Sequence, residues 1–215
     1  LPFGHSFNES RFDKMISKLD SAYVKTGDLD YLSDKGLVLI LQKKYDEALK
    51  LYLEIEKLEP NRYSTASNIG TIYELIGENE KALKWINKSI KLNSKAHNGS
   101  EWLHSKILEA KIKGKQYYNG SFLLNTDFGN DKIPMSSLKK SELDLLYKSI
   151  HFQLNERISL VKPKDDIVAA LLFELGNLSL LRKRFHDANE LFKKSKEYGN
   201  ESELLNMRMN YAEGL

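Results

Sequence analysis

The sequence contains no cysteine, and this absence excludes several kinds of chemistry at once. Without cysteine the chain has no disulfide, no thiolate ligand for zinc and no cysteine nucleophile. It also lacks any apolar run approaching the roughly 18 residues that a membrane-spanning helix needs. We therefore expect no membrane insertion. The sequence is equally compatible with a cytoplasmic location and with a periplasmic or exported location after signal-peptide removal. Proteins of both kinds can lack cysteine.

The charge of the chain is also nearly balanced, with no excess of one sign. Its 33 basic and 30 acidic residues are interspersed and leave a formal net charge of only +3. A nucleic-acid-binding protein is expected to carry a clustered basic stripe. The sequence therefore predicts no nucleic-acid partner. Its hydrophobic content of 41% is sufficient for a sizeable core in one domain or one elongated array.

The sequence shows no constellation of residues typical of an active site. The histidines are scattered rather than grouped at metal-ligand spacing, the glycines form no phosphate-binding loop, and no strand–serine–helix elbow is visible. We therefore expect no enzyme activity, no cofactor and no metal site. One alternative stays open: Asp127 and Asp131 could hold a cation together with Asn125 and Asn130.

Against these absences stands one recurring pattern of small residues. A glycine is followed 12 residues later by an alanine in three places, which are Gly36 and Ala48, Gly70 and Ala82, and Gly176 and Ala188. The first two pairs are themselves 34 residues apart. A repeat of this length, built from two amphipathic helices, is typical of a helical solenoid, whose stacked units serve mainly as binding surfaces.

The small residues suggest how the two helices of one unit pack. We expect Gly36 and Ala48 to face each other where the helices cross, so that the backbones approach closely. Larger neighbours such as Leu32, Leu39 and Tyr52 would then fill the space on either side.

The apolar periodicity divides the whole chain, 1–215, into one repeat domain with six parts. Helices are expected over 9–25, 29–42, 45–58, 97–113, 141–161 and 202–213. Gly27 ends the first helix and Asp28 caps the second. The predicted parts are an N-terminal helix (1–28), repeats at 29–62 and 63–96, a degenerate repeat at 97–164, a repeat at 165–200 and a capping helix at 201–215.

The degenerate repeat carries a long insertion over 114–140. It contains three glycines, one proline and a cluster of aromatic residues around Tyr117, Tyr118 and Phe128. Loops of this length are usually functional or disordered, and the aromatic content argues against disorder. We expect the insertion to be ordered and packed on the array, with Phe122–Leu124 as a short extended piece.

These features resemble the tetratricopeptide repeat (TPR) family. The matching stretches are Leu32–Pro60, Ile69–Ile90 and Leu172–Phe192, with small residues at the helix crossings and Pro60 closing the first unit. The resemblance implies an all-α fold, an α-solenoid of antiparallel helix hairpins wound into a right-handed superhelix. The middle of the chain departs from the pattern, because His104 stands where a small residue is expected.

The resemblance also implies where a partner would bind. Members of the family hold peptides or protein segments on a concave face formed by the leading helix of each repeat. The corresponding residues here are Ser33, Leu37, Leu41, Ser67, Asn68, Thr71, Glu74, Phe173, Asn177 and Leu181. One subclass grips a carboxylate, but Ser33, Leu37, Ser64 and Trp102 occupy the places of its clamp residues, so we expect no carboxylate clamp. The groove is either filled by the chain's own segments or available to a partner.

The leading hypothesis is a non-catalytic scaffold that binds a peptide or protein segment on the concave face. Two alternatives stay open. The chain could be a helical accessory or docking domain of a larger enzyme or of a secretion-related assembly. It could also hold a small ligand between the insertion and the concave face, in which case a polar pocket with perturbed carboxylates is expected there.

Overall fold

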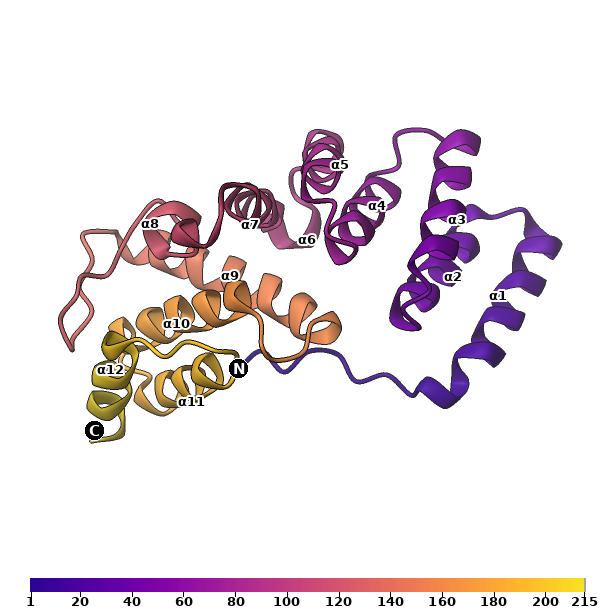
Figure 1. The fold of residues 1–215 in the computed structure, drawn as a ribbon. Helices are drawn as coiled ribbons and strands as arrows, with labels where there is room; N and C mark the ends of the chain where they lie inside the picture. Colours follow the sequence, from indigo (N-terminus) through magenta and orange to yellow (C-terminus); the bar gives the residue numbers. More distant parts are fainter. Residues whose placement is uncertain (215) are drawn as a thin grey trace. The chain divides into compact units, whose positions relative to one another are not determined.

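The computed structural model of the protein describes residues 1–214, and these form helices and their connecting loops without a β-strand (Figure 1). They fall into two compact units. The N-terminal unit is Ser6–Ala96, and the C-terminal unit combines Leu1–His5 with the chain from His97 onward. The predicted all-α class, built from helix hairpins, is confirmed. The hand of a superhelix and the division into six parts of one domain stay predictions.

Two helix hairpins and one further helix make up the N-terminal unit. Its elements are η1 (Glu9–Arg11), α1 (Phe12–Thr26), α2 (Leu29–Leu41), α3 (Tyr45–Leu58), α4 (Tyr63–Leu75) and α5 (Asn79–Leu92). Helix α2 packs against α3, and α4 packs against α5. Gly27 ends α1 in the left-handed conformation that glycine adopts easily. The carboxylate of Asp28 accepts a hydrogen bond of 2.9 Å from the N–H of Asp30, so the predicted cap is present.

The repeated glycines make room for large side chains. A Cβ atom built on Gly36 would lie 2.5 Å from Cε2 of Tyr52, and one on Gly70 would lie 2.6 Å from Cδ1 of Ile86. In the C-terminal unit, Gly176 meets the ring of Phe192 in the same way. The atoms nearest to each glycine belong to a side chain 16 residues later, one helical turn beyond the alanine. The expected close approach of Gly36 and Ala48 stays a prediction.

The C-terminal unit contains the degenerate repeat and the last repeat. Its elements are α7 (Glu101–Lys113), η2 (Lys115–Tyr117), α8 (Gly120–Leu123), α9 (Lys140–Leu160), α10 (Asp166–Leu181), α11 (Phe185–Glu197) and α12 (Glu203–Glu213). The short helix α6 (Ala96–Gly99) leads into it. Helices α10 and α11 form a hairpin, α12 packs on α11, and α9 packs against both α7 and α10.

The helix expected over 97–113 begins later than predicted. His97 and Asn98 have φ values of +51° and +56°, which lie in the left-handed region. Two successive residues of this kind cannot belong to a right-handed helix, so the regular helix starts only at Glu101. His104, which replaces the small residue of the repeat, is buried.

The insertion is ordered and packed, as predicted. Leu123, Leu124 and Phe128 belong to the core that α7, α9 and α10 share. Phe122–Leu124 was expected to be extended, and this was wrong. Phe122 and Leu123 lie in α8, because the Asn119 carboxamide accepts a hydrogen bond from the N–H of Phe122 and starts a helical turn there.

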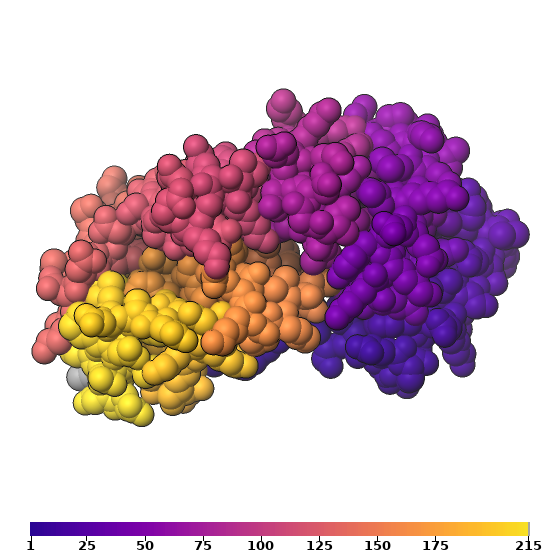
Figure 2. Space-filling view, viewed as in Figure 1, coloured from indigo at the N-terminus to yellow at the C-terminus, as the bar shows by residue number. Residues whose placement is uncertain are grey.

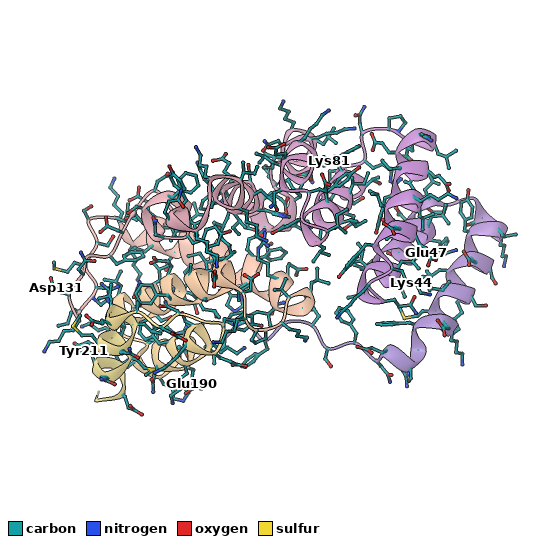
Figure 3. All side chains as sticks on the ribbon, in the orientation of Figure 1. Lys44, Glu47, Lys81, Asp131, Glu190 and Tyr211 are labelled. Carbon is teal, nitrogen blue, oxygen red and sulfur yellow. The ribbon has the colours of Figure 1, made fainter. Side chains whose placement is uncertain are left out.

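Two segments distant in sequence complete the C-terminal unit. Leu1–His5 runs along α9 and α11, where the N–H of Gly4 donates to the Asn155 carboxamide and Lys194 donates to the carbonyl of Pro2. At another place in the unit, the insertion and the residues after 200 lie side by side (Figure 2). Asp131 projects from the insertion next to α12, which carries Tyr211 (Figure 3).

Candidate functional site

The predicted face of the N-terminal unit is in part occupied by a structural hydrogen-bond network. The hydroxyl of Tyr52 donates to the carbonyl of Ser33 at 2.7 Å and accepts from the Asn68 carboxamide at 2.9 Å. The Tyr52 ring is the one that lies against Gly36. Ser33 and Asn68 therefore help to hold α2, α3 and α4 together, whether or not they also contact a partner.

The remaining predicted residues of this unit differ in exposure. Leu37 on α2 is 45% exposed, whereas Leu41 is half-buried. On α4, Thr71 is half-buried, and Ser67 and Glu74 are buried. An exposed leucine beside half-buried polar residues is consistent with a surface that can accept an apolar group.

In the C-terminal unit, two of the predicted residues line cavities along α10. A cavity of about 390 Å³, named here the loop-side cavity, lies between α10, η2 and the loop from Gly199 to Ser202. A second cavity of about 340 Å³, named the insertion-side cavity, lies between α10, the insertion and α12. Phe173 lines both, and Asn177 lines the second. The third predicted residue, Leu181, packs against the hydrophobic core.

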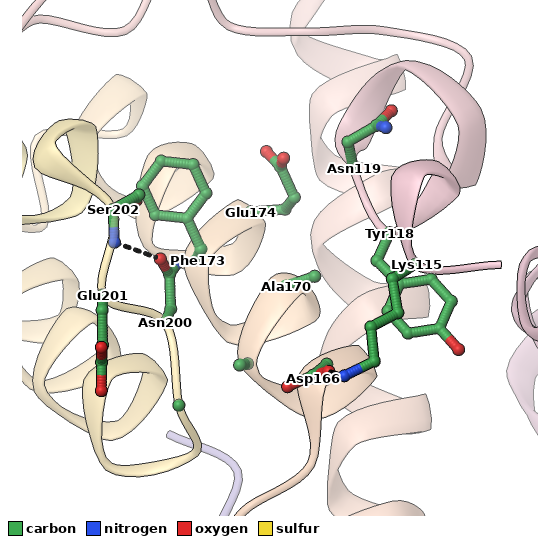
Figure 4. A pocket seen from close by; sticks show the side chains of 12 residues that line it. Lys115, Tyr118, Asn119, Asp166, Ala170, Phe173, Glu174, Asn200, Glu201 and Ser202 are labelled. Carbon is green, nitrogen blue, oxygen red and sulfur yellow. Dashed lines mark hydrogen bonds and ion pairs between the residues drawn. The ribbon is translucent and has the colours of Figure 1, made fainter.

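Glu174 lies where the two cavities meet, because it lines both of them together with Asn119 and Phe173. Figure 4 shows its carboxyl group pointing into the space between Phe173 and Asn119. Its side chain accepts a hydrogen bond of 3.0 Å from the Asn177 carboxamide and another from the N–H of Gly120. The two cavities together form a cleft along α10, and Glu174 is an ionisable group at the place where they join.

Burial raises the pKa of Glu174 to about 7. The hydrogen bond from Asn177, the positive charge of Arg208 and the N–H of Gly120 lower this pKa, whereas the negative charge of Asp127 raises it further. The desolvation of the charged form outweighs the stabilising contacts. Glu174 therefore changes its charge near neutral pH, which is unusual for a carboxyl group.

The approach of the insertion to Glu174 depends on a glycine. A Cβ atom on Gly120 would lie 2.7 Å from the Glu174 carboxyl and 2.9 Å from the carbonyl oxygen of Thr126. Both distances are shorter than side-chain carbons tolerate. Gly120 therefore lets the backbone of α8 come within hydrogen-bonding distance of α10.

Arg208 of α12 fixes the opposite wall of the insertion-side cavity. Its side chain is 1% exposed, and it donates hydrogen bonds of 3.0 Å to the carbonyls of Phe128 and Asp131 and another to Gly129. Its guanidinium group lies 5.5 Å from the centre of the Phe173 ring. Charge-assisted hydrogen bonds of this kind hold the insertion against α12.

Asn177 leaves one polar atom without a partner. The residue is 1% exposed, and its Oδ1 atom accepts no hydrogen bond from the residues that the structure describes. Such groups are rare in folded proteins, since burying an acceptor without a donor costs free energy. A donor that enters the insertion-side cavity would remove this cost.

Sequence reasoning missed Glu174, Gly120 and Arg208. A signal for Glu174 was present, because it is the one charged residue within an otherwise apolar and polar stretch from Ile167 to Leu181 and lies three positions before Asn177. For Arg208 and Gly120 no local pattern indicates the contact, since each meets groups from a distant segment.

A second charged cluster lies at the start of α7, away from the cavities. Glu101 is buried and accepts hydrogen bonds from His97 and His104. Burial alone would raise the pKa of Glu101, but these bonds and the two charges outweigh it and lower the pKa to about 2. This cluster anchors the irregular α6 turn to α7.

Among residues 1–214, no group of three or more potential ligands could hold a metal ion. In the insertion, Asp127 accepts a hydrogen bond from the N–H of Gly129, and the backbone carbonyl of Asp131 is bound to Arg208. None of the helices described is both long and apolar enough to cross a membrane.

The chain was compared with protein families, with curated proteins and with solved structures. No protein-family model matches the sequence, and no curated protein matches it. Among solved structures, a tetratricopeptide repeat protein from Parabacteroides merdae ATCC 43184 is 14% identical to this chain. The match covers 95% of this chain and 99% of that protein, with a TM-score of 0.38.

Proposed function

We propose that this protein is a non-catalytic, TPR-like scaffold that binds a segment of a partner protein on the faces of its leading helices. Three hairpins support the proposal, because each repeats the same contact between a glycine and a large side chain. Stacked hairpins of this kind form extended surfaces that bind other chains. We expect no nucleic acid among the partners, since the charges of the sequence are balanced.

The cleft along α10 is the observation that carries the proposal. The insertion packs beside this leading helix, yet cavities of about 390 Å³ and 340 Å³ remain open along it. Their lining combines the apolar surface of Phe173 and Ala170 with polar groups such as Glu174. Polar groups that converge in a concave pocket beside apolar surface can fix the orientation of a ligand.

The proposal can be tested by selecting binders from a random-peptide display library on the purified full-length chain. We expect enriched peptides to bind at least tenfold more weakly to the Ala170→Trp variant, because an indole group fills the loop-side cavity. Lys148→Trp is the matched control, since Lys148 is exposed on α9 outside both cavities. Equal binding to both variants, or no enrichment of any peptide, would contradict the α10 cleft as the binding surface.

A second variant in the same experiment tests the predicted binding face of the N-terminal unit. Leu37→Glu places a charge on the exposed part of α2. Some peptides could bind the Leu37→Glu variant more weakly but bind the Ala170→Trp variant as tightly as the parent protein. This result would assign the binding surface to the N-terminal unit.

A small-ligand site in the α10 cleft is the second candidate function. One observation favours it: a fully buried carboxyl group, Glu174, with a pKa raised to about 7, lies between two cavities. Perturbed carboxylates in clefts are common at functional sites. Binding of a small molecule that is unaffected by competing peptides would support this candidate over the scaffold.

A further inference from the structure

The carboxyl group of Glu174 has no cationic partner at ion-pair distance among the described residues. Arg208 is the cation whose charge acts on it, but that guanidinium donates its hydrogen bonds to three backbone carbonyls. A buried carboxylate is stable only when it is paired or fully hydrogen-bonded. The cleft therefore holds a negative group whose charge is incompletely compensated.

The charges around the cleft have an excess of one sign. Four acidic residues and two basic residues line the two cavities. Lys115 pairs with Asp166 at 2.6 Å, and the exposed Glu201 lies 3.7 Å from Lys164. Glu174, Asp127 and the cationic Arg208 remain, and all three line the insertion-side cavity. The two carboxyl groups outnumber the one guanidinium, whose hydrogen bonds go to backbone carbonyls, so a cationic ligand is favoured.

The hydrogen-bonding groups that line the cleft also favour a ligand that donates hydrogen bonds. The Oδ1 atom of the buried Asn177 is an acceptor that lacks a donor. Glu174 is an acceptor when it is ionised, whereas the donors of Arg208 from Nε and Nη2 are already used. A group that brings several donors and no acceptor complements this arrangement.

The contacts of Glu174 favour a compact cation over a planar one. Its carboxyl group already accepts hydrogen bonds from Asn177 and Gly120. A guanidinium needs both carboxylate oxygens free for a bidentate pair, whereas an ammonium acts as a point charge with rotatable donors. The Phe173 ring and Ala170 offer an apolar wall for the methylene chain that carries such a group.

We propose that the cleft between α10, the insertion and α12 binds the primary ammonium group of a ligand, with the Glu174 carboxylate as its ionic partner. Two sources share this chemistry, a lysine side chain of a bound peptide and a free alkyl amine. The lysine source rests on the scaffold function proposed above, whereas the free amine does not.

The proposal implies that binding strengthens as pH rises from about 6 to 8. Glu174 loses its proton over this range, while a primary amine with a pKa near 10.4 keeps its charge. Three groups face Glu174 from the elements packed around it: Arg208 from α12, Asp127 from the insertion, and the Lys115–Asp166 pair beside the loop-side cavity.

The test is calorimetric titration of the full-length chain at pH 8 with N-acetyl-lysine methylamide, and with its neutral analogue N-acetyl-norleucine methylamide. Cadaverine is the probe for a free amine. We expect at least one of the two amines to bind at least tenfold more tightly than the norleucine compound. Glu174→Gln should remove that preference, because it keeps the size of the side chain, removes its charge and replaces one acceptor oxygen with an NH2 donor.

Two controls separate a lost ligand contact from a lost fold. Glu203→Gln removes a charge from an exposed position at the start of α12 and should leave binding unchanged. Circular dichroism of each variant should show the helical content of the parent protein.

Each outcome has a distinct meaning. Tight binding of cadaverine together with no enrichment of peptides overturns the scaffold and keeps the ammonium site. Enriched peptides that lack lysine and bind Glu174→Gln as well as the parent keep the scaffold and overturn the ammonium site. Equal binding of the lysine, norleucine and cadaverine probes also overturns it.

Discussion

At the scale of the residue, three glycines of this protein have the same role, which is to leave room for a large side chain. Gly36, Gly70 and Gly176 each lie against a bulky side chain from the second helix of the same hairpin. Two of these side chains, Tyr52 and Phe192, are fully buried, so the close packing of the core prevents them from moving aside. The 34-residue register therefore reflects the fit of a glycine to a large side chain.

We predict that Gly176→Ala destabilises the protein. The change gains about 1 kcal/mol of helix propensity, but overpacking a full core costs about 1–3 kcal/mol. The new Cβ atom would overlap the Phe192 ring, so we expect a net loss of up to about 2 kcal/mol in urea unfolding. In the double variant Gly176→Ala/Phe192→Leu, the loss should be smaller than the sum of the single losses. A stabilised Gly176→Ala variant would contradict this interpretation.

Glu101 gives a prediction about pH. Its folded pKa is about 2, below the usual 4.5 of a glutamate side chain, so it contributes stability that is present above pH 4.5 and lost as pH falls toward 2. We expect Glu101→Gln to lower the free energy of unfolding by about 2 kcal/mol at pH 7 and by much less at pH 2.5. The readout is denaturant unfolding at both values of pH.

The control for this prediction lies on the same helix. Glu109 pairs with Lys106 at a partly exposed position, where an ion pair contributes at most about 1 kcal/mol. Glu109→Gln should therefore change stability little. An effect of Glu101→Gln that is the same at pH 7 and at pH 2.5 would argue against an ionic role.

At the scale of the element, the insertion is held in place from outside. Leu123 and Phe128 bury its apolar side chains in the core, and Arg208 binds its backbone carbonyls from α12. These carbonyls lie in a loop without regular secondary structure, where Arg208 supplies hydrogen bonds that a helix or sheet would otherwise provide, and Met135 N–H donates a further one to the carbonyl of Phe128. The last helix therefore does more than cover the end of the array, because it shapes the cleft along α10.

We predict that Arg208→Ala loosens the insertion selectively. Removing three charge-assisted hydrogen bonds should speed amide hydrogen exchange over residues 125–134 at least tenfold. Exchange in α4 and α5 of the N-terminal unit should stay unchanged. Arg184→Ala is the control, since Arg184 is half exposed and pairs only with its neighbour Asp187 on α11. Unchanged exchange over 125–134 in Arg208→Ala would refute the role of this residue.

At the scale of the whole molecule, the described chain falls into two compact units, with Leu1–His5 assigned to the C-terminal one. The N-terminal unit has its own fully buried side chains, such as Ile55 from α3, Ile69 from α4 and Ile86 from α5. A compact unit with its own core is expected to fold independently. If the N-terminal unit folds independently, the chain contains two domains rather than a single repeat domain.

We predict that the fragment Ser6–Ala96 folds on its own. Its thermal unfolding, followed by circular dichroism at 222 nm, should be cooperative and reversible. A shorter fragment that ends at Leu58 removes α4 and α5 and should lose this cooperativity, because a repeat is stabilised by its neighbours. A non-cooperative transition in the longer fragment would indicate that the chain folds as one array.

The candidate site was predictable only in part. The repeat pattern predicted Phe173 and Asn177 on one helix face, and both line the insertion-side cavity, because residues four apart on a helix share a face. Glu174 was not recognised, since its raised pKa comes mainly from burial beneath segments that are distant in sequence. Phe122 was missed for a different reason, because its helical turn depends on a local cap, the Asn119 carboxamide, rather than on apolar periodicity.

The sequence by itself determined the helices, the hairpins and the positions of the packing glycines, because these depend on apolar periodicity and on residue size within 34 residues. Only the tertiary structure decided which side chain fills the space at each glycine, where α6 turns, and how the insertion and α12 enclose Glu174 on α10. The physical reason is range: helix formation is governed by neighbours along the chain, whereas desolvation and electrostatic coupling are set by groups brought together from distant segments.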